Sequence, residues 1–234
     1  MAKGNHKPVP RYRSYDGPTI FTHGFRPFFL LAGLWAPIVL VLSLGQILGS
    51  LTLPSGLDAV SWHFHELLFG YVSAALAGFL LTAVPNWTDR LPLQGAPLIV
   101  LVLVWVAGRL AVATSEIIGM WPAAFIDLAF LTLLAGVTLR EIIAGRNWRN
   151  LPIVAAIIVW LISNMFFYGG QLGFLADEKL SWRLAIAVVV MLISLVGGRI
   201  IPSFTSNWLV KRGVEVLPAP FGKYDKVTLA VTLV

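Results

Sequence analysis

Six long stretches of the chain consist almost entirely of apolar residues, and they constrain the fold more than any other feature of the sequence. Apolar stretches of about 17 to 25 residues are typical of membrane-spanning helices. A soluble bundle would show polar faces at the helical period, which the stretch from Ile153 to Ile162 lacks. We predict an all-α, polytopic membrane helix bundle with six transmembrane helices, at Phe28 to Leu48, Leu67 to Val84, Pro97 to Val112, Pro122 to Leu139, Leu151 to Leu172 and Leu184 to Ile201.

Composition agrees with this class. Only 12% of the residues are charged and 58% are hydrophobic, whereas an average soluble domain carries about 25% charged residues. Cysteine is absent, which excludes disulfides, thiolate zinc sites and iron–sulfur clusters. A bound metal would have to use His, carboxylate, Met or backbone ligands.

The basic residues predict an orientation. Of the 17 Lys and Arg residues, only Arg109, Lys179 and Arg183 fall on the side opposite the N-terminus. Because cytoplasmic loops collect Lys and Arg, we expect both termini of this multi-pass membrane protein to lie in the cytoplasm. The expected layout is a cytoplasmic segment at 1–26, a six-helix domain at 27–205, and a cytoplasmic tail at 206–234 that includes the start of a truncated seventh span.

The second span carries the most unusual polar set, with His63, His65 and Glu66 within about one helical turn. Ser55 and Asp58 fit a capping box, which predicts that the histidines lie about two turns inside the helix. His63 and Glu66, three apart, share a face, whereas His63 and His65 point about 200° apart and cannot chelate one ion together.

The face that begins at His63 continues through small side chains. Gly70, Ala74, Gly78 and Thr82 follow at four-residue spacing. Such a ladder suits either the close approach of another helix or a flat cofactor against the backbone.

Comparison of depths along the spans predicts an outer polar layer of five residues, since each helical residue advances about 1.5 Å. The layer holds His63, His65, Glu66, Arg109 and Asp127. In one interpretation His63 or His65 binds a metal or haem iron and Arg109 binds a haem propionate. In the other, Arg109 forms a structural pair with a carboxylate, and both histidines are simply hydrogen-bonded.

A second polar layer is expected at the inner ends of the spans. Arginines there are usually solvated or bound to lipid phosphate. About 20 to 25 Å of depth separates His23 from His63, so one haem cannot be ligated by both. This layer comprises His23, Arg26, Asn86, Asp89, Arg90 and Arg199. Five tryptophans fall near span ends, and most of them are expected to be interface anchors: Trp62, Trp87, Trp121, Trp148 and Trp182.

Four motifs resemble those of the NnrS family. They are FRPFF at 25–29, WHFHELLFG at 62–70, AGFLLTAVPNWT at 77–88 and GGRIIPSFT at 197–205. The resemblance implies a bacterial inner-membrane protein that binds haem b and copper and is linked to denitrification and nitric oxide stress resistance. It implies His63 and His65 as metal ligands, with Glu66 and Arg26 in support.

The resemblance also implies about twelve spans, so six spans are expected to represent the N-terminal half, as a truncated product, a fragment or one half of a split protein. The expected partners are the lipid bilayer, a second copy or the missing half, and nitric oxide as a small-molecule ligand, with no nucleic acid. We expect protection of metal centres rather than turnover of a substrate. The alternatives are a half-transporter or proton channel that dimerises, a nitrogen-oxide enzyme, and a nonfunctional fragment.

Overall fold

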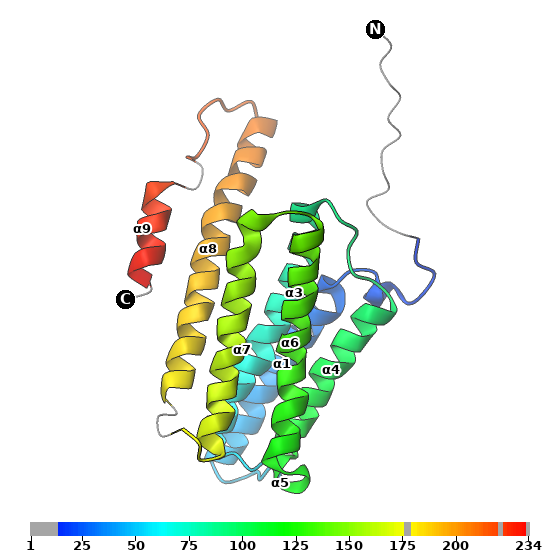
Figure 1. The fold of residues 1–234 in the computed structure, drawn as a ribbon, viewed down its shortest axis with the longest axis vertical. Coiled ribbons are helices and arrows are strands. Elements are labelled where there is room, and N and C mark those ends of the chain that lie inside the picture. Colours follow the sequence, from blue (N-terminus) through cyan, green and yellow to red (C-terminus); the bar gives the residue numbers. More distant parts are fainter. Residues whose placement is uncertain (1–13, 176–178, 220–221, 233–234) are drawn as a thin grey trace. The chain divides into compact units, whose positions relative to one another are not determined.

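The computed structural model describes residues 14–175, 179–219 and 222–232, apart from the side chains of Arg199, Leu229 and Thr232. Throughout this part of the chain the regular structure is helical (Figure 1). Six helical segments are long and apolar enough to cross a membrane, which confirms the six predicted spans. They are Phe25–Ile47, Ala59–Thr88, Ala96–Ala113, Met120–Ala144, Trp148–Gln171 and Lys179–Lys211.

The chain divides into two compact units, Met1–Val154 and Ala155–Val234. In the first unit, η1 (Thr19–Phe21) precedes the first long helix, α1 (Phe25–Ile47). Helix α1 packs against all three segments of the second span, and its Phe28 is fully buried.

The second span is one rod built from three segments, α2 (Ala59–His65), η2 (Glu66–Val72) and α3 (Ser73–Thr88). Segment η2 is a π-helix. A π-turn is wider than an α-turn and releases backbone groups from the regular ladder, and such turns occur frequently at functional sites. This one begins at Glu66, within the predicted polar cluster, and the hydropathy pattern does not predict it.

The rod begins differently from the predicted capping box. Asp58, not Ser55, is the N-cap, and its Oδ1 accepts hydrogen bonds from the Val60 and Ser61 amides at 2.9 and 3.1 Å. The Ser55 hydroxyl instead donates to the Val112 carbonyl oxygen at 3.0 Å, which ties the loop to the next span. The histidines therefore lie nearer the start of the helix than the capping box predicts.

The other long helices of this unit are α4 (Ala96–Ala113) and α6 (Met120–Ala144), linked through α5 (Ser115–Ile118). They pack closely because Gly108 has no side chain: a Cβ there would lie 3.3 Å from the Cα of Asp127. This approach brings Asp127 beside the last turns of α4. A short turn, η3 (Trp148–Asn150), leads into α7 (Leu151–Gln171).

The second unit contains most of α7, then α8 (Lys179–Lys211) and α9 (Lys223–Thr232). Helices α7 and α8 are joined by two buried serines. Ser163 donates to the Ser181 carbonyl oxygen at 2.7 Å, and Ser181 donates to that of Ser163 at 2.9 Å. Reciprocal pairs of this kind satisfy polar groups within an apolar bundle.

The tryptophans expected at the membrane interface differ in exposure. Trp121 and Trp148 expose about half of their surface (51% and 58%), as interface anchors do, but Trp62 is fully buried. Trp62 is therefore not one of the interface anchors. It lies in α2, and its indole is enclosed by the first unit.

Candidate functional site

Four ionisable side chains from three spans meet inside the first unit. His65 and Glu66 stand at the junction of α2 and η2, Arg109 lies near the end of α4, and Asp127 lies in α6. None of the four is more than 3% exposed. We call these four residues the buried network.

Arg109 links the two carboxylates of the network. Its Nη1 donates to both carboxylate oxygens of Glu66 at 2.8 Å, and its Nη2 donates to Oδ1 of Asp127. Its guanidinium also lies 5.8 Å from the centre of the Trp105 ring. The structural pairing predicted as one of two roles for Arg109 is therefore present.

His65 links the same two carboxylates from the other side. Its Nδ1 lies 3.1 Å from Oε1 of Glu66, and its Nε2 lies 3.2 Å from Oδ2 of Asp127. Both ring nitrogens are thereby committed to carboxylates. A metal would have to displace Glu66 or Asp127 in order to bind His65.

The charges of the buried network sum to zero only when His65, Glu66 and Asp127 together hold one additional proton. With Arg109 charged and both carboxylates ionised, the four groups carry one net negative charge if His65 is neutral. One further proton, on His65 or a carboxylate, makes the set neutral. Since an uncompensated buried charge costs several kcal/mol, a neutral set is the favoured state in a low-dielectric interior.

The π-turn and Gly70 make room for this arrangement. A Cβ on Gly70 would lie 2.7 Å from Nη1 of Arg109 and 2.9 Å from Oε2 of Glu66. The Gly70 carbonyl oxygen accepts hydrogen bonds from Trp105 Nε1 at 3.1 Å and from Ser73 Oγ at 2.8 Å. Gly70 thus supports the network and leaves no space for a flat cofactor at this point.

Two tryptophans complete the surroundings of the network, and the sequence reasoning missed them. Trp35 Nε1 donates to Oε2 of Glu66 at 3.0 Å, and the Trp35 and Trp105 rings meet edge-on at 5.8 Å. A signal was present, because both tryptophans fall in the middle of a span. An indole N–H in hydrocarbon needs an acceptor.

His63 lies apart from the network, in keeping with the predicted divergence of His63 and His65. Its Nδ1 lies 2.9 Å from Oγ of Ser43 in α1, and its ring is half-buried. Of the five residues expected in the outer layer, the structure brings four together and leaves His63 at the α1 contact. Ser43 was not singled out in the sequence, although a serine inside an apolar span also needs a partner.

The small-residue ladder packs against α1. A Cβ on Gly78 would lie 2.7 Å from Cδ1 of Phe29 and 3.3 Å from Cβ of Phe28. Helix packing, one of the two predicted uses of the ladder, therefore accounts for this face.

Asp89 and Arg90 of the expected inner layer line one cavity where α3 ends, whereas His23 and Arg26 make local contacts at the start of α1. His23 Nδ1 lies 3.0 Å from Oγ1 of Thr22, and Arg26 is exposed with its guanidinium 5.7 Å from the Phe25 ring centre. Partial burial and then the charge of Arg26 lower the pKa of His23 below its ordinary value. Arg199 lies in α8, but its side chain is outside the described part.

The described residues offer a single histidine ligand rather than a complete metal cage. Within the described ranges, no three His, Asp or Glu side chains are arranged to hold one ion. A haem iron needs only one proximal histidine, and a metal-binding histidine typically has its other nitrogen hydrogen-bonded. His63, held through Nδ1 by Ser43, fits that requirement, whereas the described side chains form no copper site of three His, Asp or Glu ligands.

The fold and the buried network define a polytopic membrane protein of helical type, with an ionised cluster inside its first unit. The chain belongs to the NnrS family, because the family model described as NnrS protein matches residues 19–234. Neither the curated proteins nor the solved structures include a match to the chain.

Proposed function

We propose that this chain is a haem-binding protein of the bacterial inner membrane, linked to denitrification and nitric oxide stress resistance, with His63 as the iron ligand. Membership of the NnrS family supports the haem and the physiological link. The position of His63 supports the choice of ligand, because Ser43 fixes Nδ1 and thereby directs Nε2 away from that contact.

The chain's own residues supply a rigid base for this ligand. The residues that follow His63 in the second span tie this span to its neighbours. His65 contacts Asp127 of α6, and Glu66 contacts Arg109 of α4. Ser43 joins the His63 ring to α1. A ligand held by its own helix and by a hydrogen bond is already in its binding orientation, which lowers the cost of binding. Haem iron bound there would supply a metal able to take nitric oxide as a ligand.

The family resemblance also implies copper, but the described residues support copper binding less than haem binding. No three His, Asp or Glu side chains in the described part of the chain form a set of ligands. We therefore assign copper no residue beyond the expected His63 and His65.

The experiment is to purify the chain in mild detergent and record its visible spectrum, oxidised and dithionite-reduced, with metal analysis on the same sample. A Soret band with α and β bands on reduction supports the proposal. His63→Ala together with His65→Ala should abolish it. Full haem and metal content in that double variant would overturn the assignment.

A proton relay is the second candidate function, and the buried network favours it. Three of its members, His65, Glu66 and Asp127, have side chains of a kind that can bind and release a proton, and they form a continuous chain of short contacts. This candidate predicts proton flux in proteoliposomes that falls when Asp127 or Glu66 is changed to the amide. A colourless, folded protein that conducts protons would favour it over haem binding.

The orientation with both termini in the cytoplasm is also proposed, on the distribution of Lys and Arg. The chain contains no cysteine, so single cysteines can be labelled without background. A membrane-impermeant maleimide should label Ser50→Cys, between α1 and α2, in intact cells. It should reach Arg149→Cys, between α6 and α7, only after permeabilisation, and the opposite pattern would overturn the orientation.

A further inference from the structure

A second polar site lies at the other end of the first unit, where α3 and α6 end and α4 begins. It is a cavity of about 600 Å³, which is within the size range of small-ligand sites. Its lining includes Asp89, Arg90, Arg140 and Glu141, together with apolar side chains such as Leu91 and Leu93. The proposed function uses none of these residues.

One carboxylate holds both arginines of this cavity. Glu141 accepts from Nε of Arg90, and its Oε1 accepts from Nε and Nη2 of Arg140 at 2.9 and 2.6 Å. The Glu141 side chain is 11% exposed, whereas those of Arg90 and Arg140 are 42% and 61% exposed. Both guanidiniums are thus held at one edge, which leaves the two terminal nitrogens of Arg90 and Nη1 of Arg140 able to bind an added acceptor.

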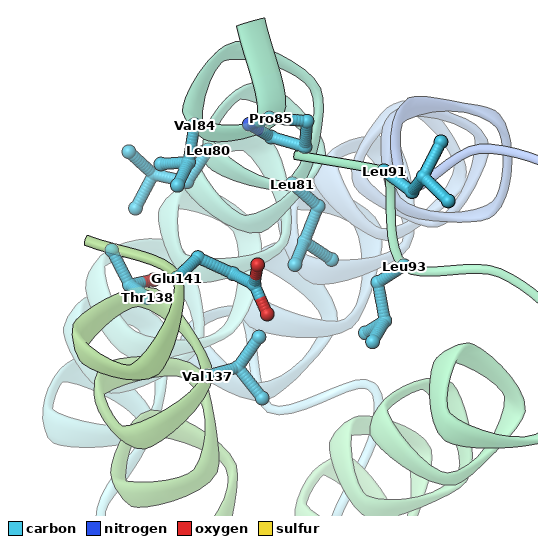
Figure 2. A pocket seen from close by; sticks show the side chains of 9 residues that line it. All are labelled: Leu80, Leu81, Val84, Pro85, Leu91, Leu93, Val137, Thr138 and Glu141. Atoms are coloured by element: carbon cyan, nitrogen blue, oxygen red, sulfur yellow. The ribbon is translucent and has the colours of Figure 1, made fainter. Parts of the chain in front are cut away.

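The apolar wall of the cavity continues as a narrow crevice that runs toward the middle of α3 and α6. Figure 2 shows the Glu141 carboxylate directed between Leu81 and Leu93, in a crevice that Val137 also lines. The crevice offers only about 10 Å³, so a ligand would not enter it. A polar cavity beside an apolar wall, at the level where spanning helices end, matches the boundary between headgroups and hydrocarbon.

The charges around the cavity select the kind of ligand. Arg90 and Arg140 are balanced by Glu141 and by Asp89, which ends α3 in the left-handed conformation at φ 53°. A formally neutral lining offers little attraction to a simple anion. A headgroup that carries both a phosphate and an ammonium matches both signs, and the α4 N-terminus beside the cavity adds a positive partial charge for the phosphate.

We propose that this cavity binds the headgroup of phosphatidylethanolamine, with Arg90 and Arg140 on the phosphate and Asp89 on the ammonium. Arginine suits phosphate because its planar fork donates parallel hydrogen bonds. The apolar wall then contacts the glycerol region of the same lipid. This inference is independent of the haem proposal.

Native mass spectrometry of the detergent-purified full chain tests the proposal, with phosphatidylethanolamine or phosphatidylglycerol titrated in. The chain should retain phosphatidylethanolamine, and Arg90→Gln with Arg140→Gln should weaken its binding by about tenfold or more, the loss expected for charge-assisted hydrogen bonds. The matched control, Arg146→Gln with Arg149→Gln, removes the same charge from exposed positions outside the cavity. It should change binding by less than about twofold.

Further variants keep the result interpretable. Arg90→Lys with Arg140→Lys preserves the charge but not the fork, so its binding should be intermediate, and circular dichroism checks that each variant is folded. Asp89→Asn should remove the preference for phosphatidylethanolamine over phosphatidylglycerol. Equal binding by the folded glutamine variant would overturn the site. Equal affinity for phosphatidylglycerol or for inorganic phosphate in the unmodified chain would overturn the ligand.

Discussion

Nε2 of His65 lies 3.2 Å from Oδ2 of Asp127, although the two residues belong to different spans. The same imidazole faces Glu66 through its other nitrogen. His65 is therefore an internal bridge between α2 and α6, and Arg109 makes a second bridge between the same carboxylates. Three spans of the first unit are tied together at one point.

Asp127→Asn should strongly destabilise the protein. The change takes a charged acceptor away from Arg109 Nη2 and His65 Nε2 inside the buried network, and a hydrogen bond to a charged group contributes about 1.5 to 3 kcal/mol. Thermal or denaturant unfolding in detergent measures the loss. Glu116→Gln removes an exposed carboxylate and should cost no more than about 0.5 kcal/mol. Equal stability of the two variants would show that the network contributes little.

Gly70→Ala should disturb the network without removing any polar group. The new methyl group would lie 2.7 Å from Arg109 Nη1, and overpacking of this kind costs about 1 to 3 kcal/mol. Gly136→Ala is the control, since a Cβ there meets nothing within 4 Å. The control should unfold at the same temperature as the unmodified chain or slightly above it. A Gly70→Ala variant as stable as the control would mean that the close packing around Gly70 is easily relieved.

Asp58→Ala should weaken the start of the second span. It removes the acceptor for the Val60 and Ser61 amides, and loss of an N-cap costs about 1 kcal/mol. Asn caps nearly as well, so Asp58→Asn should unfold within a few tenths of a kcal/mol of the unmodified chain. Equal losses in both variants would point to the charge of Asp58 rather than to its capping bonds.

His23 should titrate below 6.5, its ordinary pKa, because partial burial and then Arg26 disfavour its charged form. The folded state then binds the proton less readily than the unfolded state. The contribution of His23 to stability is therefore complete above pH 6.5 and declines as the pH falls from there through the lower pKa of the folded state. NMR titration of the imidazole, assigned with His23→Gln, gives the midpoint. Arg26→Gln should raise that midpoint, and a midpoint at or above 6.5 in the unmodified chain contradicts the account.

Periodicity and hydropathy were sufficient for the spans, because a membrane helix needs a long apolar stretch whatever its neighbours are. The same reasoning located Glu66, Arg109 and Asp127 at a similar depth, since depth depends only on the rise per residue. It left open whether Arg109 pairs with the carboxylates or with a propionate. That choice depends on how the helices rotate against one another, which the sequence alone does not state.

The remaining features depend on packing between spans. The π-turn at Glu66 and the partner of His63 on α1 have no local sequence signature. Glu141 was not predicted as a site residue, because a carboxylate at the end of a span is usually solvated. The structure instead places it between Arg90 and Arg140. The start of the second span was misplaced because Ser55 and Asp58 are both good caps, and the contact of Ser55 with Val112 decides between them.

The most direct test of the central claim compares the haem content of two single variants, His63→Ala and His65→Ala, by the reduced visible spectrum at equal concentrations of folded protein. The account predicts that His63→Ala loses the Soret band. It also predicts that His65→Ala keeps the band but unfolds at a lower temperature, because His65 serves the buried network. Retention of haem by folded His63→Ala, or its loss only in His65→Ala, would contradict the assignment of His63 as the iron ligand.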